Sequence, residues 1–469
     1  MKKEMLRINS LNMEYSTVEK LENISICLLG GECVGFLGLE NSGKKLLVDF
    51  ICGKHDLGQI SFYMDGARYI HTDELKKYVY KIAFSNYLID EWTVAEYIYL
   101  VDDSSFFSLI NRKNLVSKAE ELFRKFGLNM NVERKLKKLS ELEKRMVDLL
   151  KAYSRNAKII VIEDEFEGCS TQDIGQFKIV LDRVIHHDIA SVINSHSDNV
   201  SYILSDKYII FKKGHVVKKC HKNFFSHNSQ LEKLLLDTPP ITQKDFSENN
   251  RNEPSFVNEI VFSAGNMILK KKIIQQLDFY QGEVATILVL DVKEKTRIFE
   301  LLSGRVIDKS MSIALNNKPC NFNDIIDFVK SRVVSIADMG GESELLLSMS
   351  TGNNLLIPSL EKISVLQHVF MERKVIRMLE KEVKDNTTVK HENVKDMNVN
   401  DYIILLLERW YIYKPRVLIL FEPFVHCDIY GVSLVKSYIK KFTEIGTTVI
   451  IIKSREEYVE DISDRIIHV

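Results

Sequence analysis

Short runs of apolar residues recur along the chain and alternate with longer stretches of helical character. The runs span residues 33–37, 159–162 and 190–193 in the first half, and residues 284–290, 417–420 and 447–452 in the second half. Short apolar strands that alternate with helices are typical of a parallel sheet covered on both faces. The pattern therefore predicts an α/β fold for each half.

The two halves are related by an internal repeat. Three pairs of positions share an offset of 251 residues: Gly31 and Gly282, Lys44 and Lys295, and Gly53 and Gly304. A second block has a constant offset of 258 residues and pairs residues 158–162 with residues 416–420. Two constant offsets separated by one small insertion indicate a duplicated domain.

The repeat predicts two domains, residues 1–235 and 256–469. The segment between them, residues 236–255, is polar and holds three of the seven prolines of the chain. Few of its side chains are suited to a core, so we expect it to be a linker.

A glycine-rich loop follows the first apolar run. Residues 38–45 read GLENSGKK and contain the complete pattern G-x-x-x-x-G-K between a predicted strand and a predicted helix, as a phosphate-binding loop requires. Backbone N–H groups and the helix start would surround a polyphosphate, and Lys44 would meet its charge. Lys45 stands where Ser or Thr would place a hydroxyl on Mg²⁺. The alternative is a glycine-rich turn that binds nothing.

Further segments of the chain resemble motifs that occur, in the same order, in one protein family. They are residues 13–15 (MEY), 21–25 (LENIS), 139–143 (LSELE), 146–152, 159–166 and 194–196 (NSH), and the closing segment from Asp206 to Gly214. With these segments the whole chain resembles the tandem ATP-binding subunit of bacterial sugar-import ABC transporters of the ribose and galactose type. The resemblance implies two ABC-type P-loop NTPase domains, each a mixed, mainly parallel sheet with a helical subdomain.

The resemblance also implies the ligand and the residues that hold it. ATP would bind the first cassette, with Mg²⁺ at a metal site altered by Lys45. The residues implied in binding are Tyr15, which would stack on adenine, and Gly38, Asn41, Ser42, Gly43, Lys44 and Lys45 around the phosphates. The resemblance assigns catalysis to Glu163, Asp164 and His196, with Glu163 also as the ligand of Mg²⁺.

The first cassette departs from the family pattern at these carboxylates. The family has Asp followed by Glu, whereas this chain has Glu163 followed by Asp164. Moving each carboxylate by the length of a methylene can reduce the rate roughly 10²-fold. Leu142 replaces the glycine that would approach the γ-phosphate, and residues 84–85 lack the expected glutamine. Hydrolysis is therefore expected to be slow or lost.

The second cassette departs further. Residues 289–296 keep Lys295 and Thr296 but no glycine, and Asp291 and Glu294 would bring negative charge towards a polyphosphate. Residues 397–401 occupy the signature position without its Ser-Gly-Gly. Lys295, Thr296 and Glu422 thus mark a degenerate second site, in which we interpret Glu422 as a remnant of the fold rather than a general base.

The resemblance has consequences for partners. Cassettes of this family associate head to tail, so each site would combine one phosphate loop with the other cassette's signature, and neither composite site would be intact. The resemblance further implies membrane permease subunits as partners, and a cytoplasmic protein that is peripheral on the inner face of the cell membrane.

Composition changes this picture little. The chain has 469 residues, with 64 Lys and Arg against 65 Asp and Glu, so it lacks the basic field expected of a nucleic-acid-binding protein. Its apolar runs fall short of the roughly 18–20 residues that span a bilayer, and its amino end has no apolar stretch of signal-peptide length. Seven scattered cysteines without a C-x-x-C pair indicate reduced thiols in the cytosol.

Three hypotheses for the function follow. The chain is an energising subunit of a sugar importer, or a catalytically inactive pseudoenzyme that regulates or scaffolds a sugar transporter or sensor, or an ABC protein that acts on nucleic acid. The last is disfavoured because the linker is neither basic nor helical. A separate hypothesis is that Lys45, near Glu163, places an ammonium where Mg²⁺ would sit; the alternative is that Lys45 points into solvent.

Overall fold

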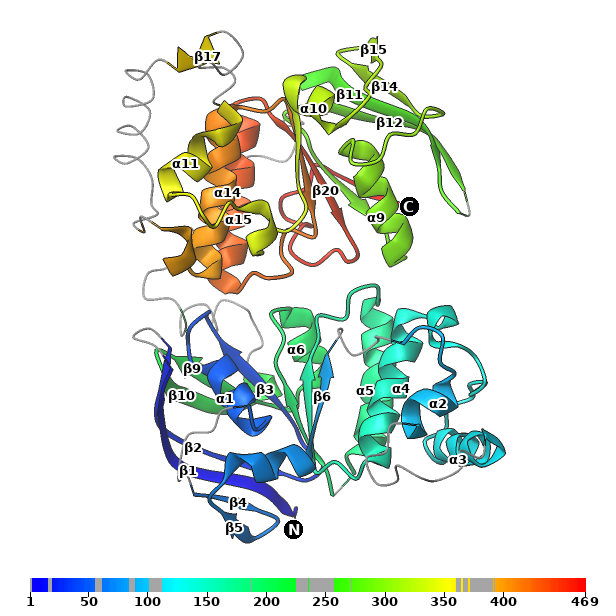
Figure 1. Cartoon of the computed structure of the whole chain (residues 1–469), viewed down its shortest axis with the longest axis vertical. Helices are drawn as coiled ribbons and strands as arrows, with labels where there is room; N and C mark the ends of the chain where they lie inside the picture. The colour runs from blue at the N-terminus through cyan, green and yellow to red at the C-terminus, as the bar shows by residue number, and fades with distance from the viewer. Residues whose placement is uncertain are drawn as a thin grey trace. The chain divides into compact units, whose positions relative to one another are not determined.

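The chain divides into two compact units, Met1–Leu235 and Leu236–Val469. The computed structural model describes residues 2–15, 19–54, 61–83, 89–100, 112–186, 188–224, 235, 257–270, 272–359, 364–365, 370–371, 391 and 393–469 (Figure 1). The linker predicted at residues 236–255 and the glutamine position at residues 84–85 lie outside them.

Unit 1 contains two sheets and a group of helices. Its strands are β1 (Glu4–Glu14), β2 (Lys20–Leu29), β3 (Cys33–Gly38), β4 (Phe62–Met64), β5 (Ala67–Tyr69), β6 (Val79–Ala83), β7 (Ile159–Glu163), β8 (Ala190–Ile193), β9 (Lys207–Lys212) and β10 (His215–His221). Its helices are α1 (Lys44–Ile51), α2 (Val94–Tyr99), α3 (Arg112–Lys125), α4 (Glu141–Ser154), α5 (Thr171–Val184) and α6 (Asp198–Leu204), with 3₁₀ turns η1 (Thr72–Lys77), η3 (Leu136–Lys138) and η4 (Lys222–Phe224).

Unit 2 repeats this series of elements. Its strands are β11 (Val257–Ile268), β12 (Ile273–Gln281), β13 (Val284–Leu288), β14 (Ser312–Leu315), β15 (Lys318–Cys320), β16 (Val333–Ile336), β17 (Ser364–Val365), β18 (Phe370–Met371), β19 (Val417–Phe421), β20 (Thr448–Lys453) and β21 (Arg465–His468). Its helices are α9 (Val292–Leu302), α10 (Ile325–Lys330), α11 (Thr351–Leu356), α14 (Val399–Tyr413) and α15 (Ile429–Glu444), with 3₁₀ turns η5 (Glu342–Glu344), η6 (Ile357–Ser359) and η7 (Val394–Asp396).

The central sheets of the two units have the same topology. In unit 1 the parallel strands lie in the order β6-β7-β8-β3-β9, and in unit 2 the order β16-β19-β20-β13-β21 matches it strand for strand. The antiparallel sheets also correspond, with orders β2-β1-β4-β5 and β12-β11-β14-β15. The predicted α/β fold, with a mainly parallel sheet repeated in both halves of the chain, is confirmed. Among the described residues, none of the helices has the length and apolar character needed to span a bilayer.

Both faces of the central strands are buried, which explains their continuous apolar runs. In β7, Ile160 and Ile162 pack into the core beneath α4 and α5, whereas Ile159 and Val161 face the core formed with α1 and the antiparallel sheet. Successive side chains of a strand point to opposite faces, so a strand between two cores needs apolar residues at every position. Figure 1 shows α2 to α5 gathered on one side of this sheet.

A buried ion pair joins α4 to the end of β7. Arg145 Nε lies 2.7 Å from Asp164 Oδ2 and Arg145 Nη2 lies 3.0 Å from Asp164 Oδ1, while the two side chains are 0% and 1% exposed. Asp164 Oδ1 also accepts the N–H of Phe166 at 2.7 Å. This two-pronged geometry is the strong form of an arginine–carboxylate pair, and it commits both oxygens of Asp164 to holding the helical layer on the sheet.

We predict that Asp164→Asn destabilises unit 1 by about 3–5 kcal/mol, because it removes the charge of the buried, two-pronged partner of Arg145, whose ion pair with Glu141 is longer, at 3.5 Å. Urea unfolding followed by Trp92 fluorescence in a Trp410→Phe background measures this, since the chain has two tryptophans and Trp92 lies in unit 1. The control Asp73→Asn removes an exposed ion pair with Lys76 and should change stability little. Similar effects of the two substitutions would contradict the prediction.

Candidate functional site

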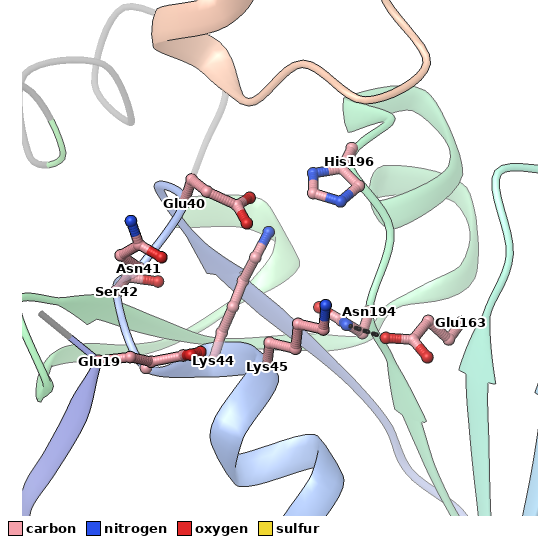
Figure 2. Close-up of a pocket in the computed structure, with 10 residues that line it drawn as sticks. Glu19, Glu40, Asn41, Ser42, Lys44, Lys45, Glu163, Asn194 and His196 are labelled. Atoms are coloured by element: carbon pink, nitrogen blue, oxygen red, sulfur yellow. Dashed lines mark hydrogen bonds between the residues drawn. The ribbon is translucent and has the colours of Figure 1, made fainter. Parts of the chain in front are cut away.

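A pocket opens at the carboxyl ends of β3, β7 and β8. It is lined by Glu19, Glu40, Asn41, Ser42, Gly43, Lys44, Lys45, Glu163, Asn194 and His196 (Figure 2). The strands β3, β8 and β7 are parallel neighbours, so the loops that follow them meet at one edge of the sheet. Ligands of open α/β sheets bind at this edge. Of the predicted catalytic residues, the fold brings Glu163 and His196 into the pocket.

The glycine-rich loop has the backbone geometry of an anion site. Gly43, the residue before α1, has φ 93°, and a Cβ at this position would lie 2.8 Å from the carbonyl oxygen of Lys20. Only glycine avoids both the strain and the clash. No side chain caps α1 among the described residues, and its first turn has no acidic residue. The N–H groups at the start of α1 are thus left for a ligand.

Two polar side chains of the loop are also suited to binding a phosphate. Ser42 is 3% exposed, and its Oγ has no hydrogen-bond partner among the described residues. Lys44 is 6% exposed, and its side chain rises through the pocket with its ammonium directed towards Glu40 (Figure 2). Burial of a hydroxyl without a partner is unfavourable in a folded protein. A phosphate oxygen would satisfy it.

The opposite wall of the pocket is formed by Glu163 and its partners. Glu163 forms an ion pair with Lys81 of β6, and Glu163 Oε1 accepts a hydrogen bond from Asn194 Nδ2 at 3.0 Å. Ala83 pairs with Glu163 in the β6–β7 register, so Lys81 lies on the adjacent strand. Lys45 is exposed and extends towards Asn194 (Figure 2). Lys45, Glu163 and Asn194 line this wall, and Lys81 pairs with Glu163 from the neighbouring strand.

Three residues expected at the site do not line this pocket: Gly38, Tyr15 and Asp164. Asp164 is held by Arg145 as described above, with both oxygens engaged. Tyr15 is 66% exposed and lies beside the pocket residue Glu19, whose carbonyl accepts the Tyr15 N–H at 3.0 Å. The geometry gives Asp164 a structural role, and stacking of Tyr15 on an adenine stays a prediction.

Glu165 anchors the loop that carries His196, a role that the sequence analysis missed. Its oxygens accept hydrogen bonds from Ser195 Oγ at 2.6 Å, from the N–H of His196 at 2.8 Å and from the N–H of Ser197 at 2.9 Å. Burial raises the pKa of Glu165, against the opposing effect of these bonds. The signal in the sequence was the third acidic residue in succession after the second apolar run.

The signature segment of unit 1 is closed by its own side chains. Ser140 Oγ accepts the N–H of Glu143 at 3.2 Å, and Glu143 Oε2 accepts the N–H of Ser140 at 2.8 Å. Arg134 pairs with Glu143 at 2.7 Å, and Leu142 packs against the core of the helical layer. This capping box fills the start of α4 and adds negative charge there.

Unit 2 fills its phosphate-loop position with its own carboxylates. Asp291 caps α9 by accepting the N–H groups of Lys293 at 2.9 Å and Glu294 at 3.0 Å. Lys295 is fully buried and its Nζ lies 2.5 Å from Glu422 Oε1 and 2.8 Å from Ser454 Oγ. Asp291 thus takes the N–H groups that a phosphate would need, and Glu422 takes the lysine.

The other predicted residues of the second site are also committed to the fold. Thr296 Oγ1 donates to the carbonyl of Val292 at 2.9 Å. Burial acts to raise the pKa of Glu422, but Lys295, Lys453 and the hydrogen bonds outweigh it, so its pKa lies below the ordinary value. The start of α14 is closed by a capping box between Asn398 and Asp401. This geometry agrees with our interpretation of Glu422 as a remnant of the fold.

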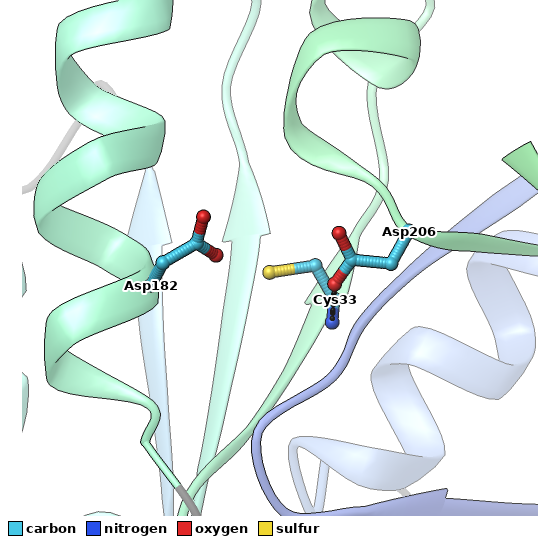
Figure 3. Close-up of side chains that lie close together, drawn as sticks. All are labelled: Cys33, Asp182 and Asp206. Carbon is cyan, nitrogen blue, oxygen red and sulfur yellow. Dashed lines mark hydrogen bonds between the residues drawn. The ribbon is translucent and has the colours of Figure 1, made fainter.

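A separate cluster in unit 1 has the residue types of a metal site. Ligand atoms of Cys33, Asp182 and Asp206 lie within 4.8 Å of one another (Figure 3). Lys178 pairs with Asp182 at 2.6 Å and with Asp206 at 3.0 Å. Burial raises the pKa of the Cys33 thiol to about 12. Lys178 supplies the positive charge that the carboxylates need, and the cluster is explained without a metal.

A second buried lysine of unit 2 generates a prediction for pH dependence. Lys453 is 5% exposed and donates to the carbonyl of Glu457. Burial lowers its pKa from 10.5 to about 8, against the opposing charges of Glu422 and Glu457. Between pH 8 and 10.5 the unfolded chain therefore binds more protons than the folded chain. The free energy of unfolding should rise with pH in this window, by up to about 3 kcal/mol.

Lys453→Met should abolish this rise, because it removes the titrating group and keeps the apolar stem. The measurement is urea unfolding from about pH 7.5 to 9.5, followed by Trp410 fluorescence in a Trp92→Phe background. The control Lys441→Met removes a lysine from the last turn of α15 and should keep the rise. Equal pH slopes for Lys453→Met and the parent would show that Lys453 is not responsible.

Comparisons with known proteins agree with the motifs. Residues 21–166 match the model of the ABC transporter family. The ribose import ATP-binding protein RbsA of Clostridium perfringens (strain 13) is 21% identical over 98% of this chain and 93% of that protein. The xylose import ATP-binding protein XylG of Thermoanaerobacter pseudethanolicus is 22% identical over 100% of this chain and 94% of that protein.

A solved structure was also matched. CbiO1 of Clostridium perfringens, part of the ABC transporter complex CbiONQ, is 14% identical, covers 50% of this chain and 95% of its own, and has a TM-score of 0.42. The resemblance drawn from the motifs is confirmed by the family match and the full-length relatives: residues 21–166 match the ABC transporter model, and the whole chain is similar to the ribose and xylose import ATP-binding proteins.

Proposed function

We propose that this chain is the ATP-binding subunit of a carbohydrate importer, in which unit 1 binds ATP and hydrolysis is slow or lost. The relatives are named as import ATP-binding proteins for ribose and xylose. The observation that carries the proposal is local: α1 starts without a side-chain cap or an acidic residue. At α9 a carboxylate accepts two N–H groups of the helix, and at α4 and α14 a carboxylate accepts the N–H of the capping residue as part of a capping box.

The charges at these four helix starts separate one binding site from three closed positions. A helix N-terminus carries partial positive charge and several N–H groups without partners, and a carboxylate placed there satisfies both. An incoming phosphate would have to displace Glu143, Asp291 or Asp401 at the closed positions. At α1 it meets Gly43, Lys44 and Lys45 instead, so the triphosphate binds here.

Weak or absent turnover follows from the engaged carboxylates. A catalytic carboxylate must reach the attacking water or the nucleophile's proton, but Asp164 is bound by Arg145 and Glu163 by Lys81 and Asn194. These contacts favour a second candidate function, a catalytically inactive ABC pseudoenzyme that binds ATP and regulates or scaffolds a sugar transporter or sensor. The two functions share the same nucleotide site.

The proposal includes partners and place. The chain docks on membrane permease subunits as a peripheral protein on the cytoplasmic face, and its two cassettes associate head to tail. In that arrangement the loop of α1 would face the Asn398–Asp401 cap, whose N–H groups are already bonded. ATP would then be bound by one cassette alone. This arrangement again favours ATP binding without efficient hydrolysis.

We predict that Lys44→Ala weakens ATP binding roughly 10- to 100-fold, the range expected when a charge-assisted hydrogen bond is lost. Isothermal titration calorimetry measures the affinity, and steady-state phosphate release measured alongside should stay near background in both proteins. The control Lys113→Ala removes an exposed lysine from α3 and should leave affinity unchanged. Unaltered ATP binding by Lys44→Ala, or rapid phosphate release abolished by it, would contradict the proposal.

A further inference from the structure

We propose that unit 1 binds the polyphosphate of its nucleotide without Mg²⁺, and that lysine ammonium groups supply the positive charge that the metal would otherwise provide. This inference rests on the proposed function, because it concerns the same pocket. It goes further by specifying that the ligand is the metal-free nucleotide. The residues at the metal position fit a lysine-bound polyphosphate and do not fit a divalent cation.

The first ligand of the metal is missing. Mg²⁺ is bound through oxygen atoms in nearly ideal octahedral geometry, and a hydroxyl at the second residue of α1 would supply one of them. Lys45 stands at that position. An ammonium has three donors and no lone pair, so it repels a cation and attracts a phosphate oxygen.

The carboxylates on this side are also engaged. One oxygen of Glu163 pairs with Lys81, and the other accepts the Asn194 amide at 3.0 Å. Asp164 gives both oxygens to Arg145. On the loop side, the carboxylate of Glu40 is directed towards the Lys44 ammonium (Figure 2). A cation that bound one of these carboxylates would have to displace the basic side chain that faces it. It would then lie beside that positive charge.

The charges balance in the metal's absence. Mg²⁺ held by one carboxylate carries a net charge of about +1, counted from its two positive charges and one negative charge. Lys45, Lys81 and Glu163 together also carry two positive charges and one negative charge. Figure 2 shows Lys45 extended towards Asn194, the residue bonded to Glu163. Around Glu163 the positive charge therefore comes from lysine side chains, while the carboxylates of Glu19 and Glu40 line the loop side of the pocket.

This arrangement also accounts for the expected loss of turnover. Phosphoryl transfer relies on a metal ion that bridges the β- and γ-oxygens and neutralises the developing charge. Ammonium groups stabilise the bound polyphosphate as point charges but do not hold its oxygens in a fixed coordination geometry. The pocket is thus suited to retaining nucleotide and unsuited to cleaving it.

The test compares ATP affinity in millimolar Mg²⁺ and in EDTA by isothermal titration calorimetry. We expect the two dissociation constants of the unaltered chain to agree within about threefold. Affinity at least tenfold weaker in EDTA would overturn this inference and leave the proposed function standing. Absence of ATP binding in both buffers would overturn the proposed function, and this inference with it.

Two variants keep the test specific to the lysines. Lys45→Thr restores the hydroxyl and should weaken binding in EDTA about tenfold. Adding Lys81→Met releases Glu163, so the double variant should regain most of the lost affinity when Mg²⁺ is supplied. The control Lys113→Thr removes a lysine from α3, outside the pocket, and thermal melting verifies the fold of each variant. Metal-independent binding that persists in Lys45→Thr at unchanged affinity would overturn the role assigned to Lys45.

Discussion

The occupation of helix N-termini by side-chain carboxylates is the constraint on which the proposed nucleotide site depends. Each N-terminus offers unbonded N–H groups and partial positive charge, and the chain's own carboxylates occupy those of α4, α9 and α14. The start of α1 differs because Gly43 has no side chain and two lysines follow it. A duplicated fold can therefore keep two nearly equivalent sheets and still differ in which helix start is open to an anion, since the difference lies in a few side chains at helix ends.

Several residues at the motif positions make stabilising contacts within their own unit. In unit 2, Glu422 balances the buried charge of Lys295 and bonds to the Ser454 amide at 2.8 Å. In unit 1, the Arg145–Asp164 pair ties the helical layer to the sheet. Breaking a buried pair by removing one partner is strongly destabilising. These contacts alone account for an acidic residue at such a position, so its presence does not itself indicate catalysis.

The sequence predicted the scaffold better than the site. The apolar runs at residues 159–162 and 417–420 correspond to β7 and β19. A strand buried on both faces is apolar at every position, so it can be recognised from the sequence alone. The partners of Asp164 and Glu163 could not be predicted in this way. Arg145 reaches Asp164 from a helix, and Lys81 reaches Glu163 through the register of β6 and β7. Such charge pairs depend on three-dimensional placement, which a motif does not encode.

The number of nucleotides bound per chain tests the central claim most directly. Calorimetric titration of the full chain with ATP at saturating concentration yields this stoichiometry. We predict one nucleotide per chain, because among the starts of α1, α4, α9 and α14 only that of α1 would accept phosphate. Two nucleotides per chain would show that the carboxylate at α9 yields to phosphate, and none would show that the start of α1 is no anion site; either result would contradict the account.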